Sequence, residues 1–343
     1  MSENTDDFEI HLGRSSYEVK DPLIKIAGVG TLGCNIIHEL MKQDAGYAQL
    51  IAMDTDECRL GFVNAPHQVQ LGKTKSTAES LTRGLGAGGD ENIGRNAAAI
   101  SMQDIKQAIK GADVLFILGG LGGGTGSGAV PLIAEIARNA GALTIALVVM
   151  PLERWGQTMN EKANKSLSAL SKIANVTIVV PDDKLLSLFK SKPELEIEHN
   201  LEAMNTLLYF IVDKTVASIT YFLKCGDIVN IDPDDLKEFC KGTGYASIGF
   251  GVGSSPYDAT RIAINCPLLH KPLGELDRYF VLIKMGKSYT IQDTQTTFSM
   301  IYEFLRPEDI SRTYICGISG SSKDPDEYNV TFIALDKRED DGR

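Results

Sequence analysis

The stretch GGLGGGTGSGAV spans residues 119–130 and directly follows the apolar run at 114–118. Seven of the ten residues from Gly119 to Gly128 are glycine. Glycine in an ordered loop costs backbone entropy, so such a run needs a structural or chemical reason. One reason is a tightly packed turn, and the other is a backbone whose N–H groups lie directly against a phosphate. We favour the phosphate, because packing seldom demands so many glycines at once.

A second glycine motif, GVGTLGCN at residues 28–35, fits the pattern G-x-G-x-x-G between an expected strand and an expected helix. Such a turn presents backbone N–H groups and a helix N-terminus to a phosphate. Asp54 ends the following strand, about where a dinucleotide-binding fold has its ribose-binding acid, so the motif taken alone favours NAD. A turn that packs tightly between strand and helix is the simpler alternative.

Two further segments carry candidate chemistry. GLGAGGDENIGRNAA at 84–98 is a third glycine-rich segment that ends in an expected helix start, with a surface loop as its alternative. NIDPDDL at 230–236 has Pro233 at a first helical position among acids, which in isolation is typical of a helix N-cap. Its acids Asp232 and Asp235 are alternatively suited to orient a water for attack on a phosphate.

Apolar runs alternate with helical periodicity and predict an α/β fold. Continuous apolar strands indicate a parallel sheet covered on both faces. The expected strands are 23–29, 50–53, 114–118, 143–149 and 176–180, and the expected helices are 34–43, 105–110, 130–139 and 159–173. After residue 198, helices at 199–224, 233–240 and 257–266 and strands at 278–285, 314–319 and 330–335 predict a smaller α/β unit.

Composition excludes several classes of protein. The chain has 343 residues and a net charge of −11, which argues against a broad nucleic-acid surface and against a polybasic membrane-binding patch. No apolar run approaches the ~20 residues of a membrane span, and the acidic start is neither a secretory signal nor a transit peptide, so we expect a cytoplasmic protein. The six cysteines form no CxxC pair and the five histidines show no metal-ligand spacing, so we expect reduced core thiols and no zinc site.

Together, the motifs resemble those of the tubulin/FtsZ family, and of bacterial or archaeal FtsZ more than of eukaryotic tubulin. GGGTGSG at 122–128 matches the family's signature loop, and the segment 84–98 resembles another FtsZ phosphate loop. VPDDKLL at 180–186 and GTGYASIGFGVGS at 242–254 resemble further FtsZ segments. Asn230, Asp232 and Asp235 match the N-x-D-x-x-D pattern of its synergy loop.

The resemblance implies a polymerising GTPase that binds GTP or GDP, with magnesium to offset the triphosphate charge. Subunits of this family assemble head to tail, and the synergy loop of one completes the site of the next. A role in cell division or a related filament follows, with FtsZ or division proteins as further candidate partners. The implied parts are a flexible N-terminal arm (1–20), a GTPase domain with a Rossmann-like parallel sheet (21–198), a long central helix (199–226), a C-terminal activation domain (227–338) with the synergy loop at 227–236, and a short tail (339–343).

The same resemblance assigns site residues. Asp232 and Asp235 are expected to activate or orient water on the neighbour's nucleotide, with Asn230 as a polar contact across the interface. The expected phosphate and nucleotide contacts are Gly30, Thr31, Leu32 and Asn35 along one side, Ala87, Gly88 and Gly89 near the terminal phosphate, and Leu121, Gly122, Gly123, Gly124, Thr125 and Gly126 at the signature loop.

The base and ribose positions depart from the FtsZ pattern. Ungapped alignment puts Trp155 and Met159 where FtsZ has a ribose-contacting Glu and an Arg, and Asp182 where it has an Asn. Asn205 and Tyr209 fall at the helix positions of the guanine-stacking aromatic and the base-reading polar residue, and a one-turn exchange would let Tyr209 stack and Asn205 hydrogen-bond. The phosphate loops are therefore intact, while guanine selectivity stays open.

Two other functions remain as alternatives. A non-hydrolysing filament or scaffold protein would keep the fold and lose turnover, against which Asp232 and Asp235 argue. An NAD-dependent dehydrogenase would use the 28–35 motif and Asp54, but it leaves the other glycine segments unexplained.

Overall fold

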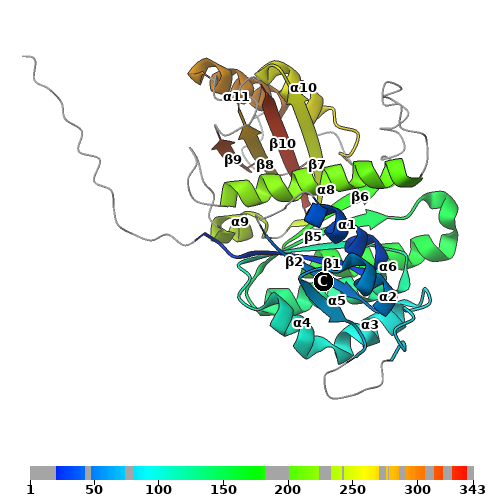
Figure 1. Ribbon diagram of the computed structural model, residues 1–343. Helices are drawn as coiled ribbons and strands as arrows, with labels where there is room; N and C mark the ends of the chain where they lie inside the picture. The colour runs from blue at the N-terminus through cyan, green and yellow to red at the C-terminus, as the bar shows by residue number, and fades with distance from the viewer. Residues whose placement is uncertain are drawn as a thin grey trace, which may run out of the picture.

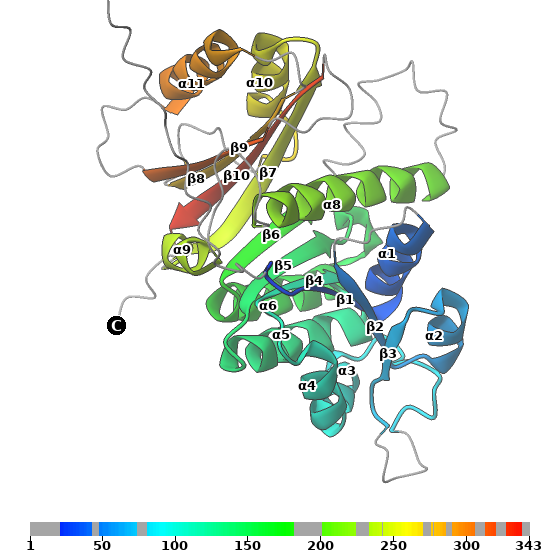
Figure 2. The same ribbon diagram turned by 60° about the vertical axis from the view of Figure 1, so that its left-hand side comes forward.

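The computed structural model describes residues 21–42, 48–73, 81–181, 201–223, 233–241, 243–269, 276, 278–285, 290–305, 313–319 and 327–337. Within these residues, ten strands form one sheet in the order β3-β2-β1-β4-β5-β6-β7-β10-β8-β9. Helices cover both faces of the first part of this sheet, and further helices lie against its last part (Figure 1, Figure 2). The predicted α/β class is confirmed.

The first part of the sheet is parallel and has helices on both sides. It consists of β1 (Ile24–Val29), β2 (Gln49–Asp54), β3 (His67–Gln70), β4 (Val114–Gly120), β5 (Leu143–Met150) and β6 (Val176–Pro181). One face packs against α1 (Gly30–Lys42), α2 (Glu57–Val63) and α8 (Leu201–Leu223), and the other against α3 (Glu91–Ile100), α4 (Met102–Ile109), α5 (Gly124–Asn139) and α6 (Gln157–Ile173). Burial on both faces explains why these strands are continuous apolar runs in the sequence.

Two helices begin earlier than their periodicity predicts. The sequence places their starts at residues 34 and 130, whereas α1 begins at Gly30 and α5 begins at Gly124. The glycines of both segments therefore belong in part to first helical turns rather than to loops. Glycine has a low helix propensity, so these turns gave no helical signal in the sequence.

Helix α8 connects the parallel strands to the rest of the molecule. It lies across the sheet, and α9 (Pro233–Phe239) follows it in the chain (Figure 2). Leu208, Val212 and Ile219 of α8 are buried in the same core as the residues of β1 and β4. The long helix predicted at 199–224 is confirmed over residues 201–223.

The last part of the sheet is mixed. β7 (Thr243–Gly253) pairs in parallel with β6 through Thr177–Tyr245 and Ile178–Ala246. The remaining strands are β10 (Tyr328–Lys337), which is antiparallel to both β7 and β8 (Arg278–Lys284), and β9 (Thr313–Ser319), which is parallel to β8. Residues of α10 (Pro256–Ile264) and α11 (Ile291–Leu305) join the core of this part, so the two predicted units share one sheet.

The sequence did not reveal β7, β3, α2 or α11. β7 is rich in glycine because α10 lies directly on it. A methyl group at Gly251 would overlap the carbonyl of Ala259, and one at Gly249 would lie 2.5 Å from the carbonyl oxygen of Ala263. Glycine inside a strand often marks such a close approach, but it also removes the apolar alternation by which strands are recognised.

Within the described ranges, no helix has the length and apolar character needed to span a lipid bilayer. Four of the cysteines, Cys34, Cys58, Cys240 and Cys266, are free thiols. Cys34 and Cys240 are buried and Cys266 is partly buried, whereas Cys58 is exposed on α2. The prediction that the thiols belong to the core is therefore wrong for Cys58.

Candidate functional site

A cavity of about 570 Å³ opens at the carboxyl ends of the parallel strands. Val29 of β1, Asp54 of β2 and Gly120 of β4 line it, each at or next to the end of its strand. The strand order reverses at this place, because the chain passes from β1 to β2 on one side and returns to β4 on the other side of β1. Open α/β sheets bind ligands at such a switch point.

Two helices point their N-termini into this cavity. α1 begins at Gly30, directly after β1, and α5 begins at Gly124, whose N-cap residue Gly123 has no side chain to accept a hydrogen bond. The first N–H groups of a helix have no partner inside the helix, so they are available to a ligand. Gly30, Thr31, Gly124 and Thr125 all line the cavity. Two helix N-termini that converge in this way are suited to bind an anion.

Close packing of main chain on main chain explains several of the glycines. A methyl group at Gly126 would overlap the carbonyl oxygen of Gly120. One at Gly94 of α3 would overlap the carbonyl oxygen of Gly124, and one at Gly128 would overlap that of Glu91. Helices α3 and α5 therefore approach each other at a distance that only glycine permits. The packing explanation accounts for more of the glycine run than the sequence suggested.

A second group of glycines is open toward the cavity. Gly88, Gly89 and Gly123 have no atom within 4 Å of the position that a Cβ would take, and all three line the cavity. No neighbouring atom excludes a side chain at these three positions, although the positive φ angles of Gly88 and Gly89 favour glycine there. Their backbone is accessible to a ligand, which matches the predicted contact with phosphate.

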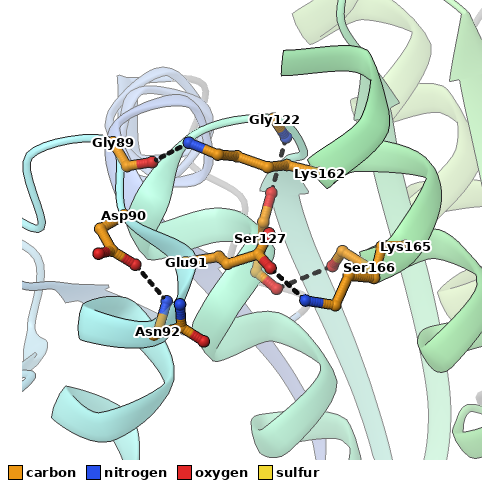
Figure 3. A network of polar contacts seen from close by, with 9 residues as sticks. All are labelled: Gly89, Asp90, Glu91, Asn92, Gly122, Ser127, Lys162, Lys165 and Ser166. Atoms are coloured by element: carbon orange, nitrogen blue, oxygen red, sulfur yellow. Dashed lines mark hydrogen bonds and ion pairs between the residues drawn. The ribbon is translucent and has the colours of Figure 1, made fainter. Parts of the chain in front are cut away.

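A proline inside α5 leaves one carbonyl of that helix free, and a side chain of α6 bonds to it. Pro131 has no N–H group for the carbonyl of Ser127, four residues earlier. Ser166 of α6 donates its hydroxyl to this carbonyl at 2.8 Å, and Ser127 Oγ accepts the N–H of Gly122 at 2.7 Å (Figure 3). The N–H of Gly122 is therefore already engaged, and Gly122 does not line the cavity.

Two acids stand at the cavity where β2 ends. Asp54 Oδ1 accepts the backbone N–H groups of Thr55 and Asp56 at 2.7 and 3.2 Å, and Thr55 Oγ1 lies 2.7 Å from Thr125 Oγ1 of α5. Asp54 Oδ2 is buried without a partner among the described residues, although Asp54 and Asp56 line the cavity. Burial raises the pKa of the Asp54 carboxyl above its ordinary value. A buried acceptor without a donor is costly, so Oδ2 indicates a ligand or solvent group that donates to it.

The other end of the cavity is apolar. Leu32 of α1, Met159 of α6 and Leu208 of α8 line it together with Trp155, which is 50% exposed in a short 3-10 turn, Glu153–Trp155, after β5. Tyr209 is half-buried beside Leu208 but does not line the cavity. Burial, followed by the charge of Glu39, raises the pKa of the Tyr209 hydroxyl.

The structure brings most of the predicted contacts together, from segments that are far apart in the sequence. Asp182, Asn230 and Asp232 lie outside the described residues, as does the side chain of Asn205. Asp235 lies exposed on α9 and is not part of the cavity. The predicted residues that line the cavity are Gly30, Thr31, Leu32, Asn35, Ala87, Gly88, Gly89, Leu121, Gly123, Gly124, Thr125, Gly126 and Trp155.

The phosphate-site prediction did not include Asp54 or Asp56. The sequence assigned Asp54 to a ribose only under the NAD alternative. Both acids stand at the end of a buried strand, at the same edge of the sheet as two glycine segments. This position was the signal that could have added them to the predicted site.

Residues 23–190 match the family model described as "Tubulin/FtsZ family, GTPase domain". Cell division protein FtsZ 1 of Thermococcus kodakarensis is 36% identical over 288 residues, which cover 83% of this chain and 74% of that protein. Cell division protein FtsZ 1 of Archaeoglobus fulgidus is 32% identical over 306 residues, with coverages of 88% and 79%.

Solved structures show the same fold. An empty FtsZ dimer from M. jannaschii superposes with a TM-score of 0.79 at 27% identity and covers 93% of this chain and 89% of its own. A GTPγS-bound protofilament of CetZ2 from Haloferax volcanii gives a TM-score of 0.71 at 17% identity, with coverages of 93% and 94%.

Glycine→alanine substitution should affect stability differently at the closely packed glycines and at the glycines that have open space around them. Gly126→Ala forces a methyl group into the backbone of Gly120 and should lower the free energy of unfolding by about 3 kcal/mol. Gly123→Ala has open space and an ordinary extended backbone, so its unfolding free energy should stay within about 0.5 kcal/mol of wild type. Denaturant titration of both variants measures the contrast, and equal losses would contradict the division.

Ser166→Ala tests the link between α5 and α6. It leaves the carbonyl of Ser127 without a donor, and a buried acceptor that loses its partner costs about 1–3 kcal/mol. Ser168→Ala, at an exposed position of the same helix, is the matched control and should change the stability little. Equal stability of the two variants in denaturant titration would show that the carbonyl finds another donor.

Asp54→Asn should stabilise the protein that has no ligand. Because the pKa of Asp54 is raised in the folded state, its ionised form opposes folding, and this penalty grows as the pH rises above the ordinary value of 3.8. We expect a gain on the order of 1 kcal/mol at pH 7, which shrinks as the pH falls toward 3.8. Thermal unfolding at the two pH values measures the difference, and a gain independent of pH would contradict the assignment to charge.

Proposed function

The chain belongs to the tubulin/FtsZ family, and from this premise we propose that it binds a guanine nucleotide in the cavity, hydrolyses the triphosphate and assembles head to tail into filaments. The observation that carries the proposal is the convergence of two helix N-termini and three open glycines in one cavity. A volume of about 570 Å³ is in the usual range of small-molecule sites. The relatives named as cell division proteins support a role in division or a related filament.

The two ends of the cavity suggest how the nucleotide lies. Phosphates would lie against the first turns of α1 and α5, because free N–H groups and the positive ends of two helix dipoles meet there. The terminal phosphate would extend toward Gly88 and Gly89, whose backbone is open. The nucleoside would then lie at the apolar end, where Trp155 offers a stacking surface.

Asp54 and Asp56 fit a magnesium ion shared with the phosphates. Mg²⁺ in nucleotide sites takes one or two carboxylates and completes its shell with phosphate oxygens and waters. The buried, unpartnered Oδ2 of Asp54 is an acceptor of the required kind. Within the described residues no three His, Cys, Asp or Glu side chains stand together, so the nucleotide would supply a large share of the ligands. The bound ion would offset the negative charge that develops on the phosphates.

The position of Asp235 favours a site shared between two copies. α9 packs near the amino ends of β5 and β6, where Leu236 lies with Ile145 and Val176, and the cavity opens at the carboxyl ends of the strands. Asp235 therefore lies near the opposite ends of these strands from its own cavity, and a copy stacked head to tail would bring it to the cavity of the next. A contact between two different surfaces that does not close into a ring repeats as a filament.

Complementation between two inactive variants tests both hydrolysis and the shared site. Asp235→Ala removes the acid, and Gly123→Asp puts a carboxylate where we expect phosphate, so each variant alone should release almost no phosphate from GTP. Mixed in equal amounts, they should recover about a quarter of the wild-type rate, because one interface in four combines an intact cavity with an intact acid. The wild-type rate per molecule should also rise steeply with protein concentration.

The alternative outcomes are distinct. Wild-type protein that filaments equally with and without GTP and releases no phosphate would support the non-hydrolysing scaffold instead. Hydrolysis with no recovery on mixing, at a rate per molecule independent of concentration, would place the whole reaction within one chain.

A further inference from the structure

One face of α6 runs beside the cavity, from Met159 at the apolar end to Lys162 at the glycine loop. Met159, Lys162 and Ser166 are spaced three and four residues apart, so they project from the same side of the helix. Met159 lies against Gly122, and Ser166 donates to the carbonyl of Ser127. Figure 3 shows the side chain of Lys162 extended from α6 toward Gly89.

Lys162 reaches a glycine of the cavity wall. Its Nζ donates to the carbonyl oxygen of Gly89 at 2.7 Å, and Gly89 lines the cavity. No acidic side chain of the described residues lies within ion-pair distance of Lys162. Lys165, one turn later, does pair with an acid, Glu91 at the start of α3 (Figure 3). The two lysines therefore differ in their partners: Lys165 forms an ion pair with a carboxylate, whereas Lys162 donates to a neutral carbonyl.

The segment that Lys162 contacts is itself loosely packed. Gly88 and Gly89 both have positive φ angles, 59° and 77°, and no atom lies within 4 Å of either Cβ position. Immediately afterwards Asp90 caps α3 by accepting the N–H of Asn92 at 2.8 Å. The hydrogen bond from Lys162 thus connects Gly88 and Gly89 to α6, while the capped start of α3 holds them on the other side.

A carbonyl is a weaker partner for an ammonium group than a phosphate. An ionised phosphate oxygen adds the attraction between two opposite full charges to the hydrogen bond, whereas a carbonyl oxygen carries only a partial charge. An ammonium group also has three donors, so Lys162 can keep Gly89 and still donate to a second acceptor. Lys162 does not itself line the cavity, so this half-buried side chain would have to extend past the Gly89 carbonyl to meet a phosphate oxygen beside Gly88 and Gly89.

We propose that Lys162 binds the terminal phosphate of a nucleoside triphosphate and joins it to the Gly89 carbonyl, so that α6 and the glycine loop distinguish a triphosphate from a diphosphate. This inference rests on the proposed function, because it requires the nucleotide to lie with its terminal phosphate at Gly88 and Gly89. A diphosphate leaves Lys162 with the carbonyl alone. Lys162 then determines whether a triphosphate or a diphosphate binds more tightly, and it does not select the base.

Affinity measurements on two matched variants test the inference. Lys162→Met keeps the length of the side chain and removes the charge, and Lys165→Met does the same one turn later. Affinities for GTPγS and GDP in magnesium buffer are obtained from the fluorescence of Trp155, the single tryptophan of the chain, which lines the cavity. Lys162→Met should weaken GTPγS binding about tenfold and change GDP binding little, as expected for a lost charge-assisted bond. Lys165→Met should leave the ratio of the two affinities unchanged.

A second measurement needs no substitution. Lysine acetylation of the wild-type protein, followed by mass spectrometry, should slow at Lys162 when GTPγS is bound and not when GDP is bound, with Lys165 as the internal reference. This result would support the inference even if Lys162→Met did not fold.

Two outcomes would overturn the inference. Equal losses of GTPγS and GDP affinity in Lys162→Met, or no loss of either, would remove Lys162 from the terminal phosphate while leaving the proposed function intact. Wild-type protein that binds neither nucleotide would refute the proposed function and the inference with it.

Discussion

Main chain packed directly on main chain is the constraint on which the rest of this structure depends. The first turn of α5 lies on the end of β4 through Gly126 and Gly120, and α3 crosses α5 through Gly94 and Gly124. Side chains at these contacts would push the helices apart and move their N-termini away from the sheet. The cavity exists in this form because glycines let the start of α5 lie directly on the end of β4 and on α3.

Such a contact supplies little hydrophobic burial, so polar links from α6 support it. The missing N–H of Pro131 would leave the carbonyl of Ser127 unpaired, and the hydroxyl of Ser166 satisfies it. The side chain of Ser127 also accepts the N–H of Gly122 and so holds the loop. Lys162 and Lys165 of α6 contact Gly89 and Glu91, before and at the start of α3. Helix α6 thus supports the glycine-rich walls of the cavity from one side.

The sequence predicted the parallel strands well, because burial on both faces turns them into continuous apolar runs. It placed the starts of α1 and α5 too late and missed β7, since glycines demanded by close contacts hide the periodicity of helix and strand alike. The glycine motifs come together around one cavity, although close packing explains the glycine at Gly126. Nothing in the sequence singled out Lys162, because a lysine on an amphipathic helix is most often only solvated, and its neighbour Gly89 lies 73 residues earlier.

The two ends of the cavity are built from different materials, and this has a consequence for how the protein can change. Peptide groups shape the end at the starts of α1 and α5, and substitutions at its closely packed glycines, such as Gly126, disturb the fold itself. Side chains such as Leu32, Trp155 and Leu208 shape the other end, and they do so from three separate elements. Replacing one of them alters what is recognised without repacking the glycine contacts. Under the proposed function, binding of the phosphates and selection of the nucleoside are therefore separable. Substitutions in this architecture can change the selected nucleoside while the phosphate-binding backbone stays the same.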